Sequence, residues 1–169
     1  MIKPLLTKTF LNYFSNLKTK NKIYLEIGSG NSTIYFSKYF KKVISLEDDK
    51  IWFDKINSNK PKNVDINFFN KENIGNLLKT ELDKKPDYVM IDNNPNYISR
   101  FDIAKFIHFN KQNDCIIILD NGTWNLEAYS FLKENYFNLD FTGKRYDNKI
   151  SVTSIFFNQT KSKYIYENI

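Results

Sequence analysis

The segment with the clearest chemical potential is Glu26-Ile27-Gly28-Ser29-Gly30, at the end of the apolar run 23–27. Such a run is typical of a buried strand, so the two glycines fall in the turn before the next helix. Glycine lets the backbone approach a ligand closely, and the first turn of a helix offers unpaired amide groups. Ligands bind at this end of the strands in an open parallel sheet. We therefore expect a ligand over residues 28–30, with Glu26 attracting a cationic amino group or sulfonium.

A second acidic residue, Glu47, indicates that this ligand contains a ribose. Glu47 ends the second predicted strand, 17 residues after Gly30, where a carboxylate can accept hydrogen bonds from both ribose hydroxyls. A dinucleotide fingerprint would have a third glycine near the pyrophosphate, but Thr33 stands there, and Glu26 would repel a pyrophosphate. The pattern argues against a nicotinamide dinucleotide. An ordinary strand-to-helix turn remains the alternative explanation of the glycines.

Acidic side chains also follow two later predicted strands. Asp92 follows the strand 88–91, and Asp120 and Asn121 follow the strand 115–119. The carboxyl ends of parallel strands share one edge of the sheet, so these residues should lie near the ligand. Two aspartates and an asparagine could bind Mg²⁺ or Ca²⁺, which would lower the pKa of a substrate hydroxyl. Alternatively, Asp120 caps the next helix, Asn121 turns the chain, and Asp92 acts directly on cofactor or substrate.

Three further side chains have functional interpretations. Arg100 begins a predicted helix and could bind a substrate carboxylate or phosphate through two hydrogen bonds, unless it pairs with Asp102. Trp124 could line an acceptor pocket, although packing in the core is the more common role of tryptophan. His108 lies late in a helix, away from the strand ends, which favours a structural role. We therefore take Arg100 and Trp124 as candidate substrate-binding residues.

Alternating strands and helices must position these residues. Apolar spacing predicts an N-terminal helix over residues 4–18, with Pro4 in its first turn. Strands are predicted at 23–27, 43–46, 64–69, 88–91 and 115–119, and helices at 32–40, 50–56, 73–82, 97–109 and 126–135. The last strands, 139–143 and 152–157, should form an antiparallel hairpin. This order predicts a Rossmann-like, doubly wound and mostly parallel sheet with helices on both faces, in one domain spanning 1–169. We expect the polar tail 161–169 to fray.

Composition excludes several other classes of protein. The net charge is +6, but the 25 basic residues include only two arginines, Arg100 and Arg145, and the lysines are scattered. We therefore do not expect nucleic acid as the partner. The single cysteine, Cys115, lies in an apolar run and should be buried, which suits the reducing cytoplasm. No window approaches 18 consecutive apolar residues, so we expect no membrane span.

Together, these residues resemble the class I S-adenosylmethionine-dependent methyltransferase family over about 23–157. That family has a seven-stranded sheet whose last strand is antiparallel, similar to the hairpin predicted here. The resemblance implies that the loop Gly28-Ser29-Gly30 and Glu26 contact the methionine part of the cofactor, and that Glu47 binds its ribose. It also implies that Asp48 and the turn Phe69-Asn70-Lys71, after strand three, lie near the adenine.

A narrower resemblance concerns the acceptor side of the site. The segment Asp120-Asn121-Gly122-Thr123-Trp124 looks like the metal-binding Asp-Asn-x-x-Trp segment of the catechol and caffeoyl-coenzyme A O-methyltransferases. Those families place a catalytic lysine three residues after the aspartate of strand four, where this chain has Pro95. The segment Asn94-Pro95-Asn96-Tyr97 resembles the Asn-Pro-Pro-Tyr motif of amino-group methyltransferases, with a shifted register and without the second proline.

The resulting hypothesis is a methyltransferase in which an acceptor oxygen, or alternatively a nitrogen, attacks the sulfonium methyl in line. Asp92 is the candidate base, alone or through a metal shared with Asp120 and Asn121. Because no inserted domain is predicted, we expect a small acceptor, such as a sugar or another hydroxylated metabolite. The alternatives are a nucleic-acid methyltransferase, a non-catalytic module that binds a nucleoside or S-adenosylmethionine, and a nicotinamide-dependent oxidoreductase. The sequence does not indicate the oligomeric state.

Overall fold

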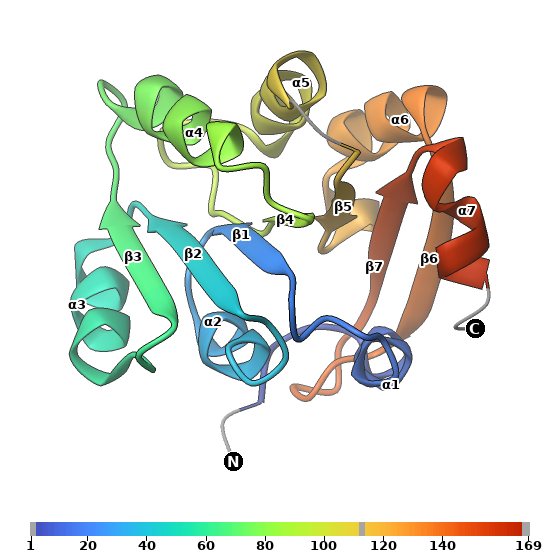
Figure 1. The fold of residues 1–169 in the computed structure, drawn as a ribbon, viewed down its shortest axis with the longest axis horizontal. Helices are drawn as coiled ribbons and strands as arrows, with labels where there is room; N and C mark the ends of the chain where they lie inside the picture. Colours follow the sequence, from blue (N-terminus) through green and yellow to red (C-terminus); the bar gives the residue numbers. More distant parts are fainter. Residues whose placement is uncertain (1–2, 112–113, 167–169) are drawn as a thin grey trace.

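A seven-stranded mixed sheet forms the centre of the protein in the computed structural model, which describes residues 3–111 and 114–166 (Figure 1). The strands are β1 (Ile23–Ile27), β2 (Lys42–Glu47), β3 (Val64–Phe68), β4 (Tyr88–Ile91), β5 (Ile116–Leu119), β6 (Phe137–Lys144) and β7 (Ile150–Phe157). Their order across the sheet is β3-β2-β1-β4-β5-β7-β6. Strands β1 to β5 are parallel, whereas β7 is antiparallel to both neighbours. The predicted fold class is confirmed.

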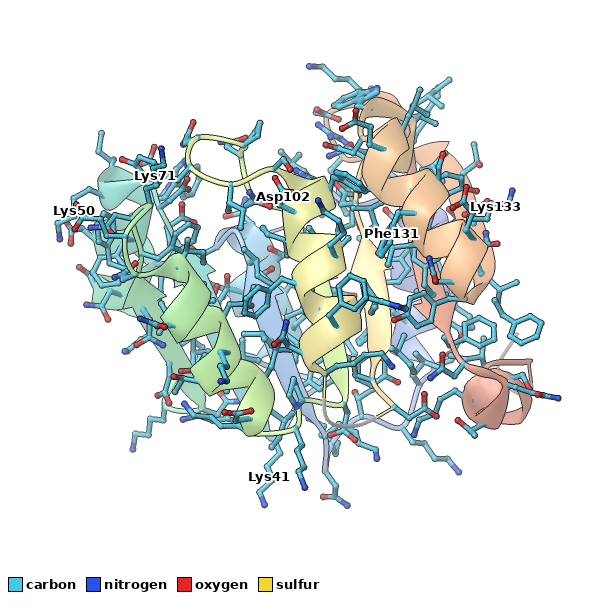
Figure 2. All side chains as sticks on the ribbon, turned by 90° about the horizontal axis from the view of Figure 1, so that it is seen from above. Lys41, Lys50, Lys71, Asp102, Phe131 and Lys133 are labelled. Atoms are coloured by element: carbon cyan, nitrogen blue, oxygen red, sulfur yellow. The ribbon has the colours of Figure 1, made fainter. Side chains whose placement is uncertain are left out.

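Helices cover both faces of this sheet. They are α1 (Lys8–Ser15), α2 (Asn31–Phe36), α3 (Lys50–Asn59), α4 (Ile74–Asp83), α5 (Arg100–Asn110), α6 (Leu126–Asn135) and α7 (Gln159–Tyr166), with a short 3₁₀ helix η1 (Gly122–Trp124). Figure 1 shows α4, α5 and α6 on one face and α1, α2 and α3 on the other. In Figure 2, α5 and α6 lie side by side, with Phe131 between them and its ring 5.8 Å from that of Phe101.

The side chains of each strand divide between two cores. Leu25, Ile27 and Val89 pack under α4 and α5, while Tyr24, Tyr88 and Met90 face α1 and α2. The second core is unusually aromatic, with Phe14 of α1 within 6.0 Å, between ring centroids, of five other rings. Two apolar faces of this kind explain why every residue of β4, and every residue of β1 except Glu26, is hydrophobic.

Several predicted helix boundaries were wrong. Helix α1 begins at Lys8 and leaves Pro4 outside it, because the Thr7 hydroxyl accepts a hydrogen bond from the Phe10 amide and caps the helix. Helix α5 begins at Arg100 because Ser99 caps it in the same way, at the Asp102 amide. The tail expected to fray forms α7 as far as residue 166, and residues 167–169 lie outside the described part. None of the described helices is long and apolar enough to cross a bilayer.

The turn after β1 packs directly against the end of β4. Gly28 has φ +95°, and a Cβ atom added there would lie 2.6 Å from the carbonyl carbon and oxygen of Asp92 and 2.7 Å from the Cα of Asn93. The amide of Asp92 donates to the carbonyl of Ile27 at 2.8 Å, which holds the two segments together. Both the backbone conformation and the space therefore require glycine at position 28.

We predict that Gly28→Ala destabilises the fold by about 2 kcal/mol or more, because alanine is strained at positive φ and its methyl group would overlap backbone atoms. The free energy of unfolding, measured by urea denaturation, checks this value. Gly75→Ala is the matched control, since nothing lies within 4 Å of the added carbon in α4 and alanine favours helix by about 0.5–1 kcal/mol. Equal stability of the Gly28→Ala variant and the wild type would contradict the prediction.

Candidate functional site

The loop after β1 is tied to the end of β2 by the carboxylate of Glu47. One oxygen, Oε2, accepts hydrogen bonds from the amide and hydroxyl of Ser29, at 2.5 and 2.6 Å. The other, Oε1, accepts from the amides of Asp48 and Asp49, at 3.0 and 2.8 Å. Burial raises the pKa of Glu47, and the hydrogen bonds from Ser29 and Asp49 act in the opposite direction. Glu47 thus lies where a ribose was expected, and it already holds the loop in shape.

Glu26 is fully buried beneath the same loop. Its Oε2 accepts hydrogen bonds from the hydroxyls of Thr33, at 2.5 Å, and Ser45, at 3.1 Å, whereas Oε1 has no hydrogen-bond partner among the described residues. Burial raises the pKa of Glu26 to about 7. The Thr33 hydroxyl also accepts a hydrogen bond from the Gly30 amide at 3.0 Å. Thr33, which stands where a dinucleotide fingerprint has its third glycine, therefore orients both Glu26 and the loop.

Gly30, unlike Gly28, has free space where a side chain would be. A Cβ atom at position 30 would meet only Ser32 Oγ, at 3.9 Å, and the backbone there has the extended φ of 175°. The fold therefore tolerates a larger residue at this position. The glycine keeps free space at the loop surface, which is what the approach of a ligand requires.

The residues expected near an adenine are not equivalent. Asp48 is buried, and its Oδ2 has no hydrogen-bond partner among the described residues. The Phe69 side chain is fully buried in the core under α4, so only its backbone is available to a ligand. The Asn70 side chain accepts from the amides of Glu72 and Asn73, at 3.0 and 3.1 Å, and so shapes the turn before α4. Of these residues, Asp48 offers a buried acceptor without a partner among the described residues.

Asp92 lies at the end of β4 beside a cavity of about 390 Å³. Its Oδ1 accepts a hydrogen bond from Nη2 of Arg100 at 3.0 Å, and 26% of its side chain is exposed. Burial and the charge of Asp120 raise the pKa of Asp92 well above its usual range, against the opposing effect of Arg100. A carboxylate of this kind can take a proton from a hydroxyl placed in the cavity.

Arg100 also donates hydrogen bonds to the backbone carbonyls of Asn93 and Asp120, at 2.9 and 2.7 Å, so its guanidinium holds the ends of β4 and β5 together.

The side chains of Asp120 and Asn121 are occupied by neighbours and do not fit a metal site. The Asp120 oxygens accept from Thr153 Oγ1, at 2.8 Å, and from Asn121 Nδ2, at 2.6 Å. The Asn121 oxygen accepts from Ser151 Oγ at 2.7 Å and from Nη1 of Arg145 at 2.9 Å. Two guanidinium groups lie where a cation was expected, and the described residues contain no group of three His, Cys, Asp or Glu side chains that could hold one. The predicted Mg²⁺ or Ca²⁺ site therefore gains no support from this geometry.

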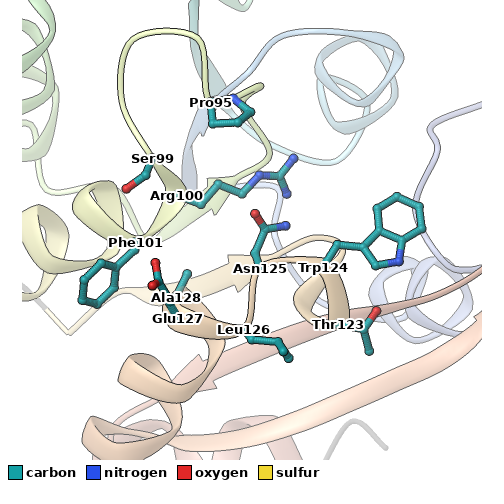
Figure 3. Close-up of a pocket in the computed structure, with 10 residues that line it drawn as sticks. All are labelled: Pro95, Ser99, Arg100, Phe101, Thr123, Trp124, Asn125, Leu126, Glu127 and Ala128. Carbon is teal, nitrogen blue, oxygen red and sulfur yellow. The ribbon is translucent and has the colours of Figure 1, made fainter.

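A second depression, of about 340 Å³, continues the cavity on the far side of Arg100 (Figure 3). The two hollows share four residues: Pro95, Arg100, Trp124 and Asn125. Figure 3 shows the Arg100 and Asn125 side chains reaching into the space between the 94–99 segment and η1. Trp124 is 59% exposed as a residue, so the tryptophan forms a wall of the groove instead of packing in the core.

Two further residues of this region, Asn93 and Arg145, were not predicted as site residues from the sequence. Asn93 is fully buried; its amide nitrogen donates to the carbonyls of Asn94 and Ile98, and its Oδ1 has no hydrogen-bond partner among the described residues. Arg145 comes from the turn between β6 and β7 and lies 5.5 Å from the Trp124 ring. Arginine is rare in this sequence, and that rarity was the one feature that could have marked Arg145 as a site residue. His108, by contrast, has the expected structural role, with its Nδ1 2.8 Å from the Tyr136 hydroxyl.

Comparison with known proteins gives matches in structure only. No protein-family model matches the sequence, and no curated protein does. An O-methyltransferase from Bacillus cereus, solved with S-adenosylhomocysteine, is 14% identical with a TM-score of 0.67, over 89% of this chain and 78% of that one. TomG from Streptomyces achromogenes, an O-methyltransferase of tomaymycin synthesis solved with S-adenosylmethionine, is 12% identical with a TM-score of 0.63, over the same shares of each chain.

A third solved structure is nearly the same length as this chain. SMU.1697c, a putative methyltransferase from Streptococcus mutans in complex with S-adenosylhomocysteine, is 16% identical with a TM-score of 0.57, over 93% of this chain and 99% of that one. Identities this low establish the arrangement of the elements. The chain therefore has the Rossmann-like fold of the class I methyltransferases, with a seven-stranded sheet and an antiparallel last strand.

Proposed function

We propose that this chain is an S-adenosylmethionine-dependent methyltransferase, formed by residues 1–169 as one domain. The observation that carries the proposal is a set of three buried oxygens without hydrogen-bond partners in the described chain: Glu26 Oε1, Asp48 Oδ2 and Asn93 Oδ1. They come from the carboxyl ends of β1, β2 and β4, which are neighbours in the sheet. An unpaired buried acceptor costs about 1–3 kcal/mol, so a ligand with several hydrogen-bond donors would be stabilised here.

S-adenosylmethionine has the donors and the charge for such a site. It carries an ammonium group, a sulfonium, two ribose hydroxyls and the adenine amino group. Glu26 suits the ammonium group. Glu47 suits the ribose hydroxyls when they replace the hydrogen bonds that Ser29 donates to its carboxylate. Asp48 suits the adenine amino group. A dinucleotide is disfavoured, because three carboxylates would face its pyrophosphate.

The acceptor side supports transfer to an oxygen of a small, hydroxylated molecule. The cavity beside Asp92 is about 390 Å³, which suits a metabolite such as a sugar. In our proposal, the acceptor hydroxyl would lie against Asp92, which would take its proton as the oxygen bonds to the methyl group in line; the sulfur–methyl bond would break and S-adenosylhomocysteine would leave. Arg100 and Trp124 line the cavity, and positioning supplies most of the rate enhancement. The similar O-methyltransferase structures support this reaction class.

We predict that Asp92→Asn lowers the rate of methyl transfer about 10²- to 10⁴-fold, because the amide cannot accept the proton. The measurement is transfer of radiolabel from S-adenosylmethionine to a panel of hydroxylated small molecules at saturating cofactor. Asp102→Asn, at an exposed site of α5, is the matched control and should keep full turnover. Full turnover by the Asp92→Asn variant would remove the proposed base, whereas absence of transfer by the wild type across a broad panel would favour a non-catalytic binding module.

We predict that Gly30→Ala weakens S-adenosylhomocysteine binding about tenfold or more, because the methyl group occupies the space left for the cofactor. The thermal stability of the free protein should stay close to that of the wild type. The check is the rise in melting temperature on adding the ligand, which reports affinity. Gly75→Ala should show the wild-type rise. An undiminished rise for the Gly30→Ala variant would place the cofactor elsewhere.

The raised pKa of Glu26 predicts how cofactor affinity depends on pH. Folding raises this pKa from 4.5 to about 7, so the contribution of Glu26 to stability is full below pH 4.5 and is lost as the pH rises through 7. A cationic ligand binds the ionised carboxylate and must displace its proton below pH 7. Affinity for S-adenosylmethionine should therefore rise with pH and level off above 7, being about tenfold weaker at pH 6 than on the plateau.

Equilibrium dialysis between pH 5.5 and 8 measures this dependence. The Glu26→Gln variant should bind weakly across the range and lose the change centred near pH 7, because its amide does not titrate. If the wild type and Glu26→Gln show the same pH dependence, Glu26 does not contact the cationic group of the cofactor.

A further inference from the structure

Both arginines of this lysine-rich chain line the same cavity. Arg100 and Arg145 are two of 25 basic residues, they stand 45 positions apart in the sequence, and each side chain is less than 10% exposed. They border the hollow of about 390 Å³ together with Asp92 and Asp120. Arginine is the residue best suited to bind oxyanions through paired N–H groups, so its placement here bears on the acceptor.

Each guanidinium keeps hydrogen-bonding capacity after its contacts within the described chain. Arg145 donates from Nε and Nη2 to Asp147, at 3.2 and 2.5 Å, and from Nη1 to Asn121 at 2.9 Å. Because each terminal nitrogen carries two hydrogens, one N–H on Nη1 and one on Nη2 remain for a ligand. The guanidinium is also held against the Trp124 ring, which fixes its direction at the groove wall.

The N-terminal segment brings two lysines to Tyr146, the neighbour of Arg145 in the turn between β6 and β7. The Lys3 and Lys8 ammonium groups lie 4.4 and 5.3 Å from the ring centroid of Tyr146, the residue after Arg145. Leu5, between them, lines the cavity itself. The segment is anchored at both ends, because Asn31 Nδ2 donates to the Lys3 carbonyl and the Thr7 amide donates to Thr153 Oγ1, both at 3.3 Å.

The charge balance at the Arg145 end of the cavity is positive. Lys3, Lys8 and Lys149 are exposed around Arg145, and Asp147 is the acidic residue paired with it. Hydrogen bonding to Arg145 lowers the pKa of Asp147 to about 2, so one negative charge offsets one guanidinium and leaves the three lysines. Deeper in the cavity, Asp92 pairs with Arg100 and Asp120 adds a second carboxyl group, so the positive excess is confined to the Arg145 end. A monoanion would compensate only part of this excess charge, whereas a phosphoryl group would match it better.

We infer that the Arg145 end of this cavity, with Lys3 and Lys8 held beside it on Tyr146, binds a phosphoryl group of the acceptor. The acceptor is then a phosphorylated small molecule, whose hydroxyl lies toward Asp92 and whose phosphate lies toward the turn between β6 and β7. This assignment of the acceptor rests on the proposed methyltransferase function. The anion subsite itself can be tested without any methyl transfer.

The test uses inorganic pyrophosphate as the probe and Trp124 as the reporter. In a Trp52→Phe background Trp124 is the remaining indole, since the chain has two tryptophans. We expect a saturable change in Trp124 fluorescence on adding pyrophosphate at constant ionic strength, a weaker response to inorganic phosphate and none to acetate. Saturation with S-adenosylhomocysteine should leave pyrophosphate binding intact, because the two ligands occupy different places.

Matched variants decide whether the response belongs to this subsite. The double variant Lys3→Gln/Lys8→Gln should lower the affinity for pyrophosphate about fivefold, since each exposed charge contributes a fraction of a kcal/mol. Lys62→Gln/Lys79→Gln removes the same charge from exposed positions before β3 and on α4, and should leave the affinity unchanged. Arg145→Gln should abolish the response.

Three outcomes would overturn the inference. The first is a fluorescence response that does not saturate, and the second is an equal loss of affinity in the two double lysine variants. The third is tighter binding of a short single-stranded RNA than of pyrophosphate, which would indicate a nucleic-acid surface. These results are distinguishable from failure of the proposed function. Cofactor binding without a pyrophosphate response would refute only the anion subsite. A pyrophosphate response without cofactor binding would refute only the methyltransferase assignment.

Discussion

The close contact between Gly28 and the backbone of Asp92 and Asn93 is the constraint on which the candidate site depends. It joins the ends of β1 and β4, the two strands at which the order of the sheet reverses. Crevices at such reversals are where doubly wound sheets bind ligands. Because the contact involves backbone atoms, it holds the loop 28–30 beside the backbone of Asp92. The Asp92 carboxylate is oriented separately, by its hydrogen bond from Arg100.

Around this contact, the protein keeps polar groups buried at an energetic cost. The pKa values of Glu26, Asp92 and Asp120 are all raised, with burial as the largest cause. Three acceptors at the ends of β1, β2 and β4 also lack partners in the described chain. Burying such groups destabilises a free protein, whereas a ligand that supplies donors and positive charge recovers the loss. The distribution of these groups is what a site prepared for a cationic nucleoside requires.

The sequence predicted the parts of the fold that depend on local pattern. The bounds of β1 and β4 were predicted correctly, because each is a short run that is hydrophobic apart from Glu26, packs on both faces and ends at a polar turn. The start of α1 was not, because capping by Thr7 outweighed the apolar periodicity that extends back to Leu6. Helix α7 was not predicted, because its segment looks polar, although Ile165 is fully buried in the aromatic core.

Within the site, the limits of prediction follow from contacts that join distant segments. The spacing of Glu26, Glu47 and Asp92 along alternating strands was enough to place them at one edge of the sheet. The roles of Asp120 and Asn121 depend on Thr153, Ser151 and Arg145, which the hairpin β6–β7 brings back beside β5. No local pattern in the sequence indicates those partners.

The central claim is that the edge formed by β1, β2 and β4 binds S-adenosylmethionine. Calorimetric titration of the purified wild-type protein with S-adenosylmethionine and S-adenosylhomocysteine, at pH 8, tests it most directly. We predict saturable binding of one molecule per chain with a micromolar dissociation constant, about −8 kcal/mol, and the same affinity with a chelator present. Titration without heat or saturation, or binding that requires an added divalent cation, would contradict it.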